Sequence, residues 1–273
     1  TAVGSDTTGV GSVISSPFRT IGKALPLATT GDTIFIDAGL YTETVVIAVD
    51  SVVLIGKDSG STVIDPPSGN GITASNRSGL AIKNLGVTGA TDALNFSSVS
   101  LTTVTGDSFT SSSNGLFMTA SNNLTISKNE SRSNSGYGIY LSSCDSATVT
   151  ANYAKSNGNM GFAVQSSNGT YTDNNAQSNS NRGFYLQNAN NNVFKNNTSS
   201  GQTYGVEFFG NGDTNTFISN RMTGNTVNGI YLNNSQSNIF AQNTFDLNTQ
   251  YQVYVINGSR NNVFLKNNLQ PSS

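Results

Sequence analysis

A short pattern restarts every 22 to 24 residues between Gly115 and Tyr251. Each restart is a glycine followed by a stretch in which apolar residues alternate with other residues. The restarts begin at Gly115, Gly138, Gly161, Gly183, Gly205 and Gly229, in steps of 23, 23, 22, 22 and 24 residues. Self-similarity at such a period is typical of a solenoid, in which each turn contacts only its neighbours. The repeat therefore predicts one elongated stack of turns and not a globular sandwich.

The alternation also predicts which side chains form the core. Positions one and three residues after each glycine are apolar, and the position between them must face outward. The inward pairs are Leu116/Met118, Ile139/Leu141, Phe162/Val164, Phe184/Leu186, Val206/Phe208 and Ile230/Leu232. Burial of each such side chain contributes about 1.5–3 kcal/mol. A turn gains this energy only when neighbours cover both of its ends.

Two columns of amide side chains recur with the same period. The first lies three residues after an apolar position and comprises Asn129, Asn152, Asn174, Asn197, Asn220, Asn243 and Asn267. The second lies five residues further on and comprises Asn134, Asn157, Asn179, Gln202, Asn225 and Asn248. Strands stacked about 4.8 Å apart would place each amide over the next, where it can both donate and accept a hydrogen bond. Asparagine also tolerates the left-handed backbone of tight corners. We expect structural ladders here and not a ligand site.

The N-terminal part of the chain differs from the regular repeats. Residues 1–16 are small and polar and are expected to form an arm or linker. Residues 17–55 are expected to form a cap and the first strands, with a helix of about two turns from Phe18 to Leu25 that Pro26 ends. Strands are expected at 31–37, 40–47 and 51–55. Regular rungs are expected over 71–273.

This segment resembles the N-terminal cap of the pectin-lyase-like right-handed parallel β-helix proteins. Their recurrent motifs are Pro-Phe-x-Thr-Ile, Gly-Asp-Thr-Ile and Gly-x-Tyr-x-Glu, which occur here at 17–21, 31–34 and 39–43. The later turns resemble the β-helix repeats of the periplasmic NosD-type and carbohydrate-binding families. The resemblance implies an all-β fold, a single right-handed parallel β-helix of about ten rungs with a short N-terminal helical cap. It implies no particular activity, because the superfamily contains both enzymes and non-enzymes.

The outward positions of the repeated strand carry a column of aromatic residues, and Ala163 and Glu207 interrupt it. The column comprises Phe117, Tyr140, Tyr185, Tyr231 and Tyr254. Aromatic residues favour strands and stack between neighbouring strands, which is one interpretation. Aligned exposed aromatics also form an apolar patch that another subunit or a sugar chain could cover. All three interpretations remain open at this point.

Catalytic residues are not expected. Glycosidases need two acids about 5 to 9.5 Å apart, and no two acids of the repeats share a column in adjacent turns. Glu207 and Asp213, six residues apart across a turn, are the alternative pair. The chain has no histidine, the commonest general base and metal ligand. Cys144 and the three methionines do not make the copper site that a NosD-like protein would need. We therefore expect no metal and no cofactor.

Composition narrows the range of functions. Only 10% of the residues are charged and the net charge is −2, so no basic patch for nucleic acid is present. No apolar run is long enough to span a membrane. The main hypothesis is a non-catalytic extracellular or cell-surface protein that binds to itself and assembles into a layer, sheath or filament. It depends on the missing acid–base residues, the aromatic column, the low charge and a last rung without a cap. The alternative is a protein that binds or degrades a cell-surface polysaccharide through the tyrosines and Glu207.

Overall fold

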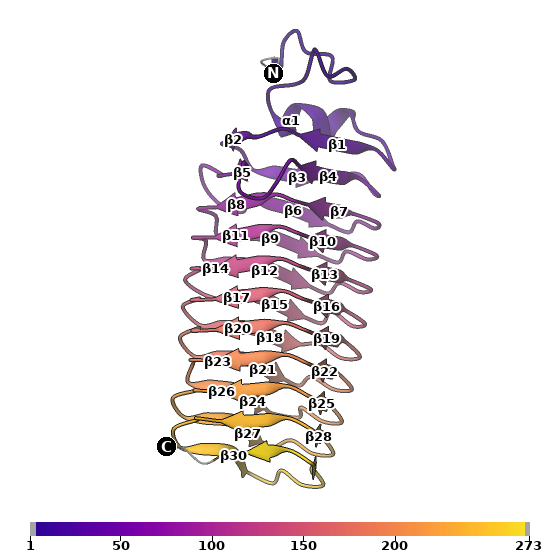
Figure 1. The fold of residues 1–273 in the computed structure, drawn as a ribbon. Helices are drawn as coiled ribbons and strands as arrows, with labels where there is room; N and C mark the ends of the chain where they lie inside the picture. Colours follow the sequence, from indigo (N-terminus) through magenta and orange to yellow (C-terminus); the bar gives the residue numbers. More distant parts are fainter. Residues whose placement is uncertain (1–3, 271–273) are drawn as a thin grey trace.

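The repeats stack into about ten turns in the computed structural model, which describes residues 4–270 (Figure 1). Each turn contributes one strand to each of three parallel sheets, which we name A, B and C, except the last described turn, which adds none to sheet C. Hydrogen-bonded neighbours within a sheet are therefore three strands apart along the chain. The register follows the repeat, since Leu116 pairs with Ile139 and Ile139 pairs with Phe162. The predicted right-handed parallel β-helix is confirmed.

The strands are short in sheets A and B and longer in sheet C. Sheet A contains β1 (Thr33–Ile36), β4 (Val53–Gly56), β7 (Ala81–Lys83), β10 (Thr103–Thr105), β13 (Thr125–Ser127), β16 (Thr148–Thr150), β19 (Thr170–Thr172), β22 (Val193–Lys195), β25 (Thr216–Ile218), β28 (Ile239–Ala241) and β31 (Val263–Leu265). Sheet B contains β2 (Gly39–Tyr41), β5 (Thr62–Ile64), β8 (Gly86–Thr88), β11 (Ser108–Thr110), β14 (Glu130–Arg132), β17 (Tyr153–Lys155), β20 (Asn175–Gln177), β23 (Thr198–Ser200), β26 (Arg221–Thr223), β29 (Thr244–Asp246) and β32 (Asn268–Leu269). Sheet C contains β3 (Val45–Ile47), β6 (Ile72–Ser75), β9 (Asp92–Ser97), β12 (Asn114–Thr119), β15 (Ile139–Ser142), β18 (Met160–Gln165), β21 (Arg182–Gln187), β24 (Tyr204–Phe209), β27 (Asn228–Asn233) and β30 (Tyr251–Ile256).

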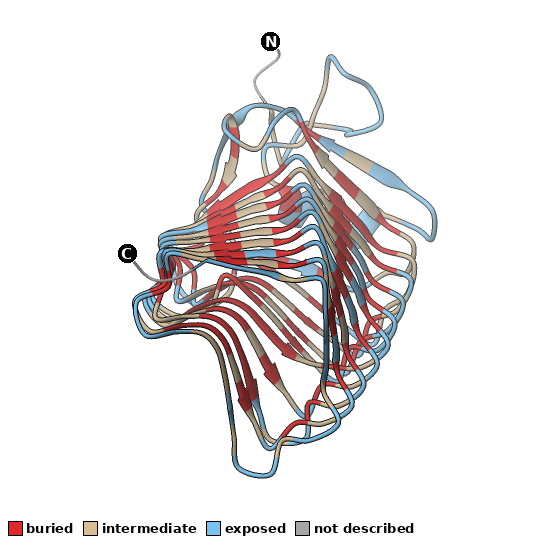
Figure 2. Ribbon diagram, turned by 60° about the horizontal axis from the view of Figure 1, so that its bottom comes forward, coloured by how far each residue is buried: buried red, intermediate tan, exposed pale blue. Residues whose placement is uncertain are grey.

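The core lies between the three sheets and runs the length of the stack. Figure 2 shows that the buried positions of successive turns lie in register. Every inward pair predicted from the repeat is buried. Sheet A adds a column of stacked rings, in which the centroids of Tyr171 and Phe194 are 4.5 Å apart and those of Phe194 and Phe217 are 4.4 Å apart. Such stacking adds about 0.5–1.5 kcal/mol per pair beyond burial.

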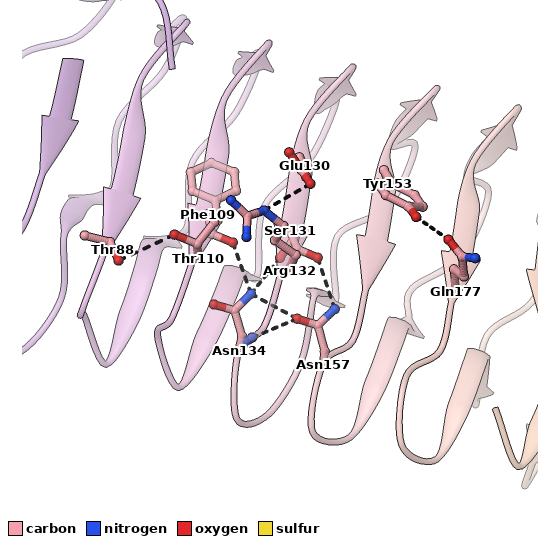
Figure 3. Close-up of polar contacts among 10 residues, drawn as sticks. All are labelled: Thr88, Phe109, Thr110, Glu130, Ser131, Arg132, Asn134, Tyr153, Asn157 and Gln177. Carbon is pink, nitrogen blue, oxygen red and sulfur yellow. Dashed lines mark hydrogen bonds and ion pairs between the residues drawn. The ribbon is translucent and has the colours of Figure 1, made fainter. Parts of the chain in front are cut away.

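Both predicted amide columns form hydrogen-bonded ladders at the corners. In the first, the Asn152 side-chain amide and its backbone N–H both donate to Asn174 Oδ1 at 3.0 Å. Figure 3 shows the second, in which Asn134 Nδ2 donates to Asn157 Oδ1 at 3.0 Å. A third ladder, which the sequence analysis missed, comprises Asn192, Asn215, Asn238 and Asn262. The recurring Asn-x-Phe-x-x-Asn pattern of residues 192–197 would have revealed it.

The repeated glycines are required by close packing against the second ladder. A Cβ atom on Gly161 would lie 2.8 Å from Asn179 Nδ2 and 2.8 Å from the carbonyl oxygen of Gly183. Both contacts are shorter than a carbon atom tolerates, and the carbonyl belongs to the backbone of the next turn. The glycine column and the second amide column thus pack against each other at the same corner of each turn, although they appear as separate features in the sequence.

We expect Gly161→Ala to lower the free energy of unfolding by about 1–3 kcal/mol, the usual cost of overpacking. Chemical denaturation followed by circular dichroism would measure the change. Gly60→Ala is the matched control, because its added Cβ would make only an ordinary 3.4 Å contact with Asp58. Equal stability of the two variants would contradict this account of the glycine column.

The N-terminal cap is shorter than expected. The helix α1 covers Ile21–Ala24 and a 3-10 turn η1 covers Leu25–Leu27. The helix begins late because Thr20 has an extended backbone and its hydroxyl accepts the Lys23 N–H. No helix within the described residues has the length and apolarity to cross a membrane.

The strand expected at 40–47 is divided into β2 and β3 by a corner. The Glu43 carboxylate in this corner accepts the backbone N–H groups of Ile21 and Gly22. Unpaired N–H groups at a helix start favour such an anion. Residues 4–16 contain no strand, but Asp6 accepts hydrogen bonds from the backbone of Arg19 and from the Thr20 hydroxyl.

Candidate functional site

The aromatic column and Glu207, which were predicted from the sequence as candidate binding residues, lie on the outer surface of sheet C. We define the sheet C face as three columns of outward positions on β9 to β30. The first column is Asp92, Asn114, Tyr137, Met160, Arg182, Tyr204, Asn228 and Tyr251. The central column is Asn95, Phe117, Tyr140, Ala163, Tyr185, Glu207, Tyr231 and Tyr254. The third column is Ser97, Thr119, Ser142, Gln165, Gln187, Phe209, Asn233 and Ile256.

The predicted aromatic column is in register and only partly exposed. Phe117 stacks on Tyr140 with ring centroids 4.5 Å apart, and Tyr231 stacks on Tyr254 at 5.6 Å. The column is interrupted at Ala163, which is 1% exposed because larger side chains surround it, and at Glu207. The rings of the aromatic column therefore pack against one another, and each leaves only part of its surface open to solvent.

A second set of aromatic residues flanks this column, and the sequence analysis missed it. Tyr137 packs on Tyr140 with centroids 5.1 Å apart, and Tyr251 packs on Tyr254 at 4.9 Å. These flanking residues, like Tyr204, precede the repeat glycine or its equivalent. A tyrosine directly before the glycine was the signal that would have revealed them. The aromatic surface is therefore two side chains wide at the turns of β15 and β30.

An ion pair lies in the middle of the face. Arg182 Nε on β21 contacts a carboxylate oxygen of Glu207 on β24. The guanidinium carbon of Arg182 lies 5.1 Å from the ring centroid of Tyr185 and 5.8 Å from that of Tyr204. Glu207 is only 4% exposed and lies in register between Tyr185 and Tyr231. Two tyrosine rings and the arginine thus shield the carboxylate from water.

The tyrosines around Glu207 stay protonated near neutral pH. Burial, and then the negative charge of Glu207, raise the pKa of Tyr185 above its ordinary value. The same two causes, in the same order, raise the pKa of Tyr231. Neutral phenols donate and accept hydrogen bonds but are poor general bases. The cluster is therefore suited to holding a ligand and poorly suited to abstracting a proton.

Glu207 and Asp213 contact different partners, and Glu207 pairs with Arg182. Asp213 lies in the turn after β24, and its carboxylate accepts the backbone N–H of Gln236 at 2.8 Å. The other acid of the sheet C face is Asp92, which accepts hydrogen bonds from Asn95 and Asn114. Asp92 and Glu207 are separated by five turns, or about 24 Å at 4.8 Å per turn. That separation far exceeds the ~9.5 Å limit for glycosidase carboxylates.

Comparison with known proteins places the chain among the β-helix proteins. Residues 29–228 match the family model described as periplasmic copper-binding protein (NosD). No curated protein sequence matches the chain.

Solved structures give the same fold. The A-module of the Azotobacter vinelandii mannuronan C-5 epimerase AlgE4 superposes with a TM-score of 0.68 at 16% identity, over 89% of this chain and 87% of that one. The catalytic unit of a GH87 α-1,3-glucanase from Streptomyces thermodiastaticus gives 0.65 at 12% identity, over 92% and 65%. Pectate lyase Pel9A gives 0.62 at 14% identity, over 98% and 75%. Identities this low establish the fold alone.

The residues of this chain do not fit a copper ion. The sequence has no histidine, and within residues 4–270 no three Cys, Asp or Glu side chains cluster as metal ligands. Cys144 is buried, and burial raises the pKa of its thiol to about 11. Copper prefers thiolate, thioether and imidazole ligands, but Met118 and Met222 are buried in the core like Cys144. We therefore derive no function through copper.

Proposed function

The chain belongs to the NosD family of parallel β-helix proteins, and from that premise we propose that it binds a polysaccharide along the sheet C face. Structural relatives with the same fold include enzymes named for mannuronan, α-1,3-glucan and pectate. A straight, repetitive surface suits a repetitive, extended ligand, because each turn can contact the polymer in a similar way. The proposal selects the alternative hypothesis of the sequence analysis over self-assembly, for which the comparisons give no support.

The observation that carries the proposal is the combination of rings and amides on one face. The flat side of a sugar ring carries C–H groups that pack on aromatic rings. The exposed parts of the Tyr140 and Tyr185 rings offer such a surface. Sugar hydroxyls need partners that donate and accept, and amides do both. Gln165 and Gln187 supply such amides beside the rings, with Gln165 Nε2 donating to Gln187 Oε1 at 2.7 Å.

The same face supports binding over cleavage. Its two carboxylates are too far apart for glycosidase chemistry, as described above. The charge of Arg182 is neutralised by its ion pair with Glu207. The phenols of Tyr185 and Tyr231 stay protonated, because their pKa values are raised. We therefore propose a binding protein, and a reducing-end assay with the bound polymer would detect hydrolysis if it occurred.

We expect the double variant Tyr185→Ala/Tyr231→Ala to weaken polysaccharide binding at least tenfold, which corresponds to about 1.4 kcal/mol. Both rings line the middle of the face beside Glu207, and aromatic residues dominate binding energy when truncated. Affinity electrophoresis through gels containing soluble polysaccharides would measure the change.

Tyr153→Ala is the matched control for that experiment. Tyr153 is a half-buried tyrosine on the outer face of sheet B, where its hydroxyl donates to Gln177 Oε1 (Figure 3). Its removal should leave binding unchanged. Equal losses in the control and the double variant would place the binding surface elsewhere and refute the proposal.

We further propose that the protein acts outside the cytoplasm, in the periplasm or the extracellular space. The description of the matched family as periplasmic supports this location. Self-assembly into a layer, sheath or filament stays a prediction. Light scattering of the purified protein across a dilution series would test it.

A further inference from the structure

We propose that the polymer taken by the sheet C face is an uncharged polysaccharide and not a polyuronate. This inference rests on the proposed function, because it assigns the chemistry of the ligand to the same face. It follows from the distribution of charge on the three columns, and from the way in which Arg182 is held.

The sheet C face carries almost no net charge. From β9 to β30, its three columns contain only three charged residues, which are Asp92, Arg182 and Glu207. Arg182 and Glu207 neutralise each other, which leaves one negative charge at one end of the face. The other lysines and arginines from Lys83 onward lie in sheets A and B or in turns outside the three columns.

A polyuronate would present one carboxylate per sugar to this face. Proteins bind carboxylates most strongly through the paired N–H groups of arginine, which give charge-assisted hydrogen bonds. Arg182 is the one cation of the face, and its Nε contacts the Glu207 carboxylate, which neutralises its charge. A ligand carboxylate that approached the Nη groups of Arg182 would also approach the negative charge of Glu207, which is 4% exposed and little screened by water. A ligand carboxylate that took over Nε would leave Glu207 buried without its partner, which is strongly unfavourable.

An uncharged polysaccharide meets no such penalty. Its hydroxyls match the neutral groups of the face, which both donate and accept hydrogen bonds. The Tyr140 hydroxyl donates to Gln165 Oε1 at 2.9 Å, so a chain of neutral polar groups runs beside the rings to Gln187. Asn233 continues the same column two turns beyond Gln187. The ion pair holds Arg182 over the rings of Tyr185 and Tyr204, where it adds to the flat surface.

Affinity electrophoresis and calorimetry with defined polymers test this inference. The probes are laminarin and glucomannan as neutral polymers, and alginate and polygalacturonate as anionic ones. We expect binding to neutral polymers that is unchanged between about 0.05 M and about 1 M NaCl, because salt screens only charge–charge attraction. We expect binding to the anionic polymers to be at least tenfold weaker.

The variant Glu207→Gln tests the role of the ion pair directly. It frees Arg182 and should raise the ratio of alginate affinity to neutral-polymer affinity at least tenfold over the unmodified protein. Glu130→Gln is the matched control, because Glu130 is also an ion-paired carboxylate, 3.1 Å from Arg132, but lies on sheet B (Figure 3). The control should gain no affinity for alginate.

The outcomes separate this inference from the proposed function. Tight binding of alginate by the unmodified protein, abolished by Tyr185→Ala/Tyr231→Ala, would overturn the uncharged ligand and keep the face as the binding site. Binding of neutral polymers that the same double variant leaves intact would overturn the face. Binding of no polymer of either class would overturn both proposals.

Discussion

Replacement of Asn174 by alanine should lower the free energy of unfolding by about 3–5 kcal/mol, although the change removes few atoms. Asn174 Oδ1 accepts the backbone N–H and the side-chain amide of Asn152, both at 3.0 Å. Its Nδ2 donates to the carbonyl of Val149 at 2.8 Å and to Asn197 Oδ1 at 3.0 Å. The variant leaves the Asn152 N–H and the Val149 carbonyl without these partners in a buried corner, at about 1–3 kcal/mol for each group.

Chemical denaturation is the measurement, and Asn175→Ala is the matched control. Asn175 is the next residue, but its side chain points to the outer face of sheet B, takes no part in the ladder, and has its Oδ1 buried without a hydrogen-bond partner. Its replacement removes no side-chain hydrogen bond and should not lower stability by more than about 0.5 kcal/mol. A similar small effect at both positions would mean that the ladder contributes little, and that apolar burial alone holds the turns in register.

The stability of the protein should fall as the pH rises from about 4 to about 8, and Asp107→Asn should remove this dependence. Asp107 occupies the first position of the first ladder, where its backbone N–H donates to Asn129 Oδ1 at 3.0 Å. One carboxyl oxygen accepts the Leu85 N–H at 2.8 Å, while Oδ2 is buried without a partner. In the next turn the equivalent atom is Asn129 Nδ2, which donates to two oxygens, those of Val104 and Asn152. A carboxyl group can replace that amide only if it is protonated.

Burial raises the pKa of Asp107 from 3.8 to about 8 in the folded protein. Between these two values the folded state binds a proton that the unfolded state releases. The contribution of Asp107 to folding stability is therefore greatest below pH ~4, falls by about 1.4 kcal/mol per pH unit, and becomes flat above pH ~8. The amide of Asp107→Asn needs no proton, so the variant should be more stable at pH 7, by about 4 kcal/mol.

Thermal and chemical unfolding of both proteins at pH 4.5, 6 and 7.5 would measure these effects. Asp173→Asn, which changes an exposed carboxyl group, is the control and should leave the slope unchanged. A slope that persists in Asp107→Asn would assign the pH dependence to other groups. A loss of stability in Asp107→Asn at pH 7 would show that the ladder prefers the carboxylate at its first position.

The regular part of the fold could be predicted from sequence because each turn contacts only its neighbours. Leu116, Met118 and their equivalents could be identified as core residues, because alternation along a strand decides which side chains point inward. The amide columns at Asn129 and Asn134 were visible for the same reason, as one residue type repeated at each corner. The cap was less predictable, because the break between β2 and β3 depends on Glu43 reaching a helix formed by residues 21–24.

The candidate site was only partly visible. Tyr140, Tyr185 and Tyr231 were predicted on the outward face from spacing alone. The flanking Tyr137 was missed, although a tyrosine directly before the repeat glycine marks it. The ion pair of Arg182 with Glu207 was not predictable from the columns, because it joins different columns of neighbouring turns.

The sequence by itself determined the period, the core and the corners of this protein, because one rule of alternation applies in every turn. The tertiary structure alone decided the chemistry of individual groups. Glu207 is buried and paired with Arg182 only because neighbouring turns stack, which brings together side chains 25 residues apart. In the same way, stacking buries one oxygen of Asp107 without a hydrogen-bond partner, between groups that are 22 residues away along the chain. Burial and partner charge set the protonation of such groups, and neither quantity exists in the chain before it folds.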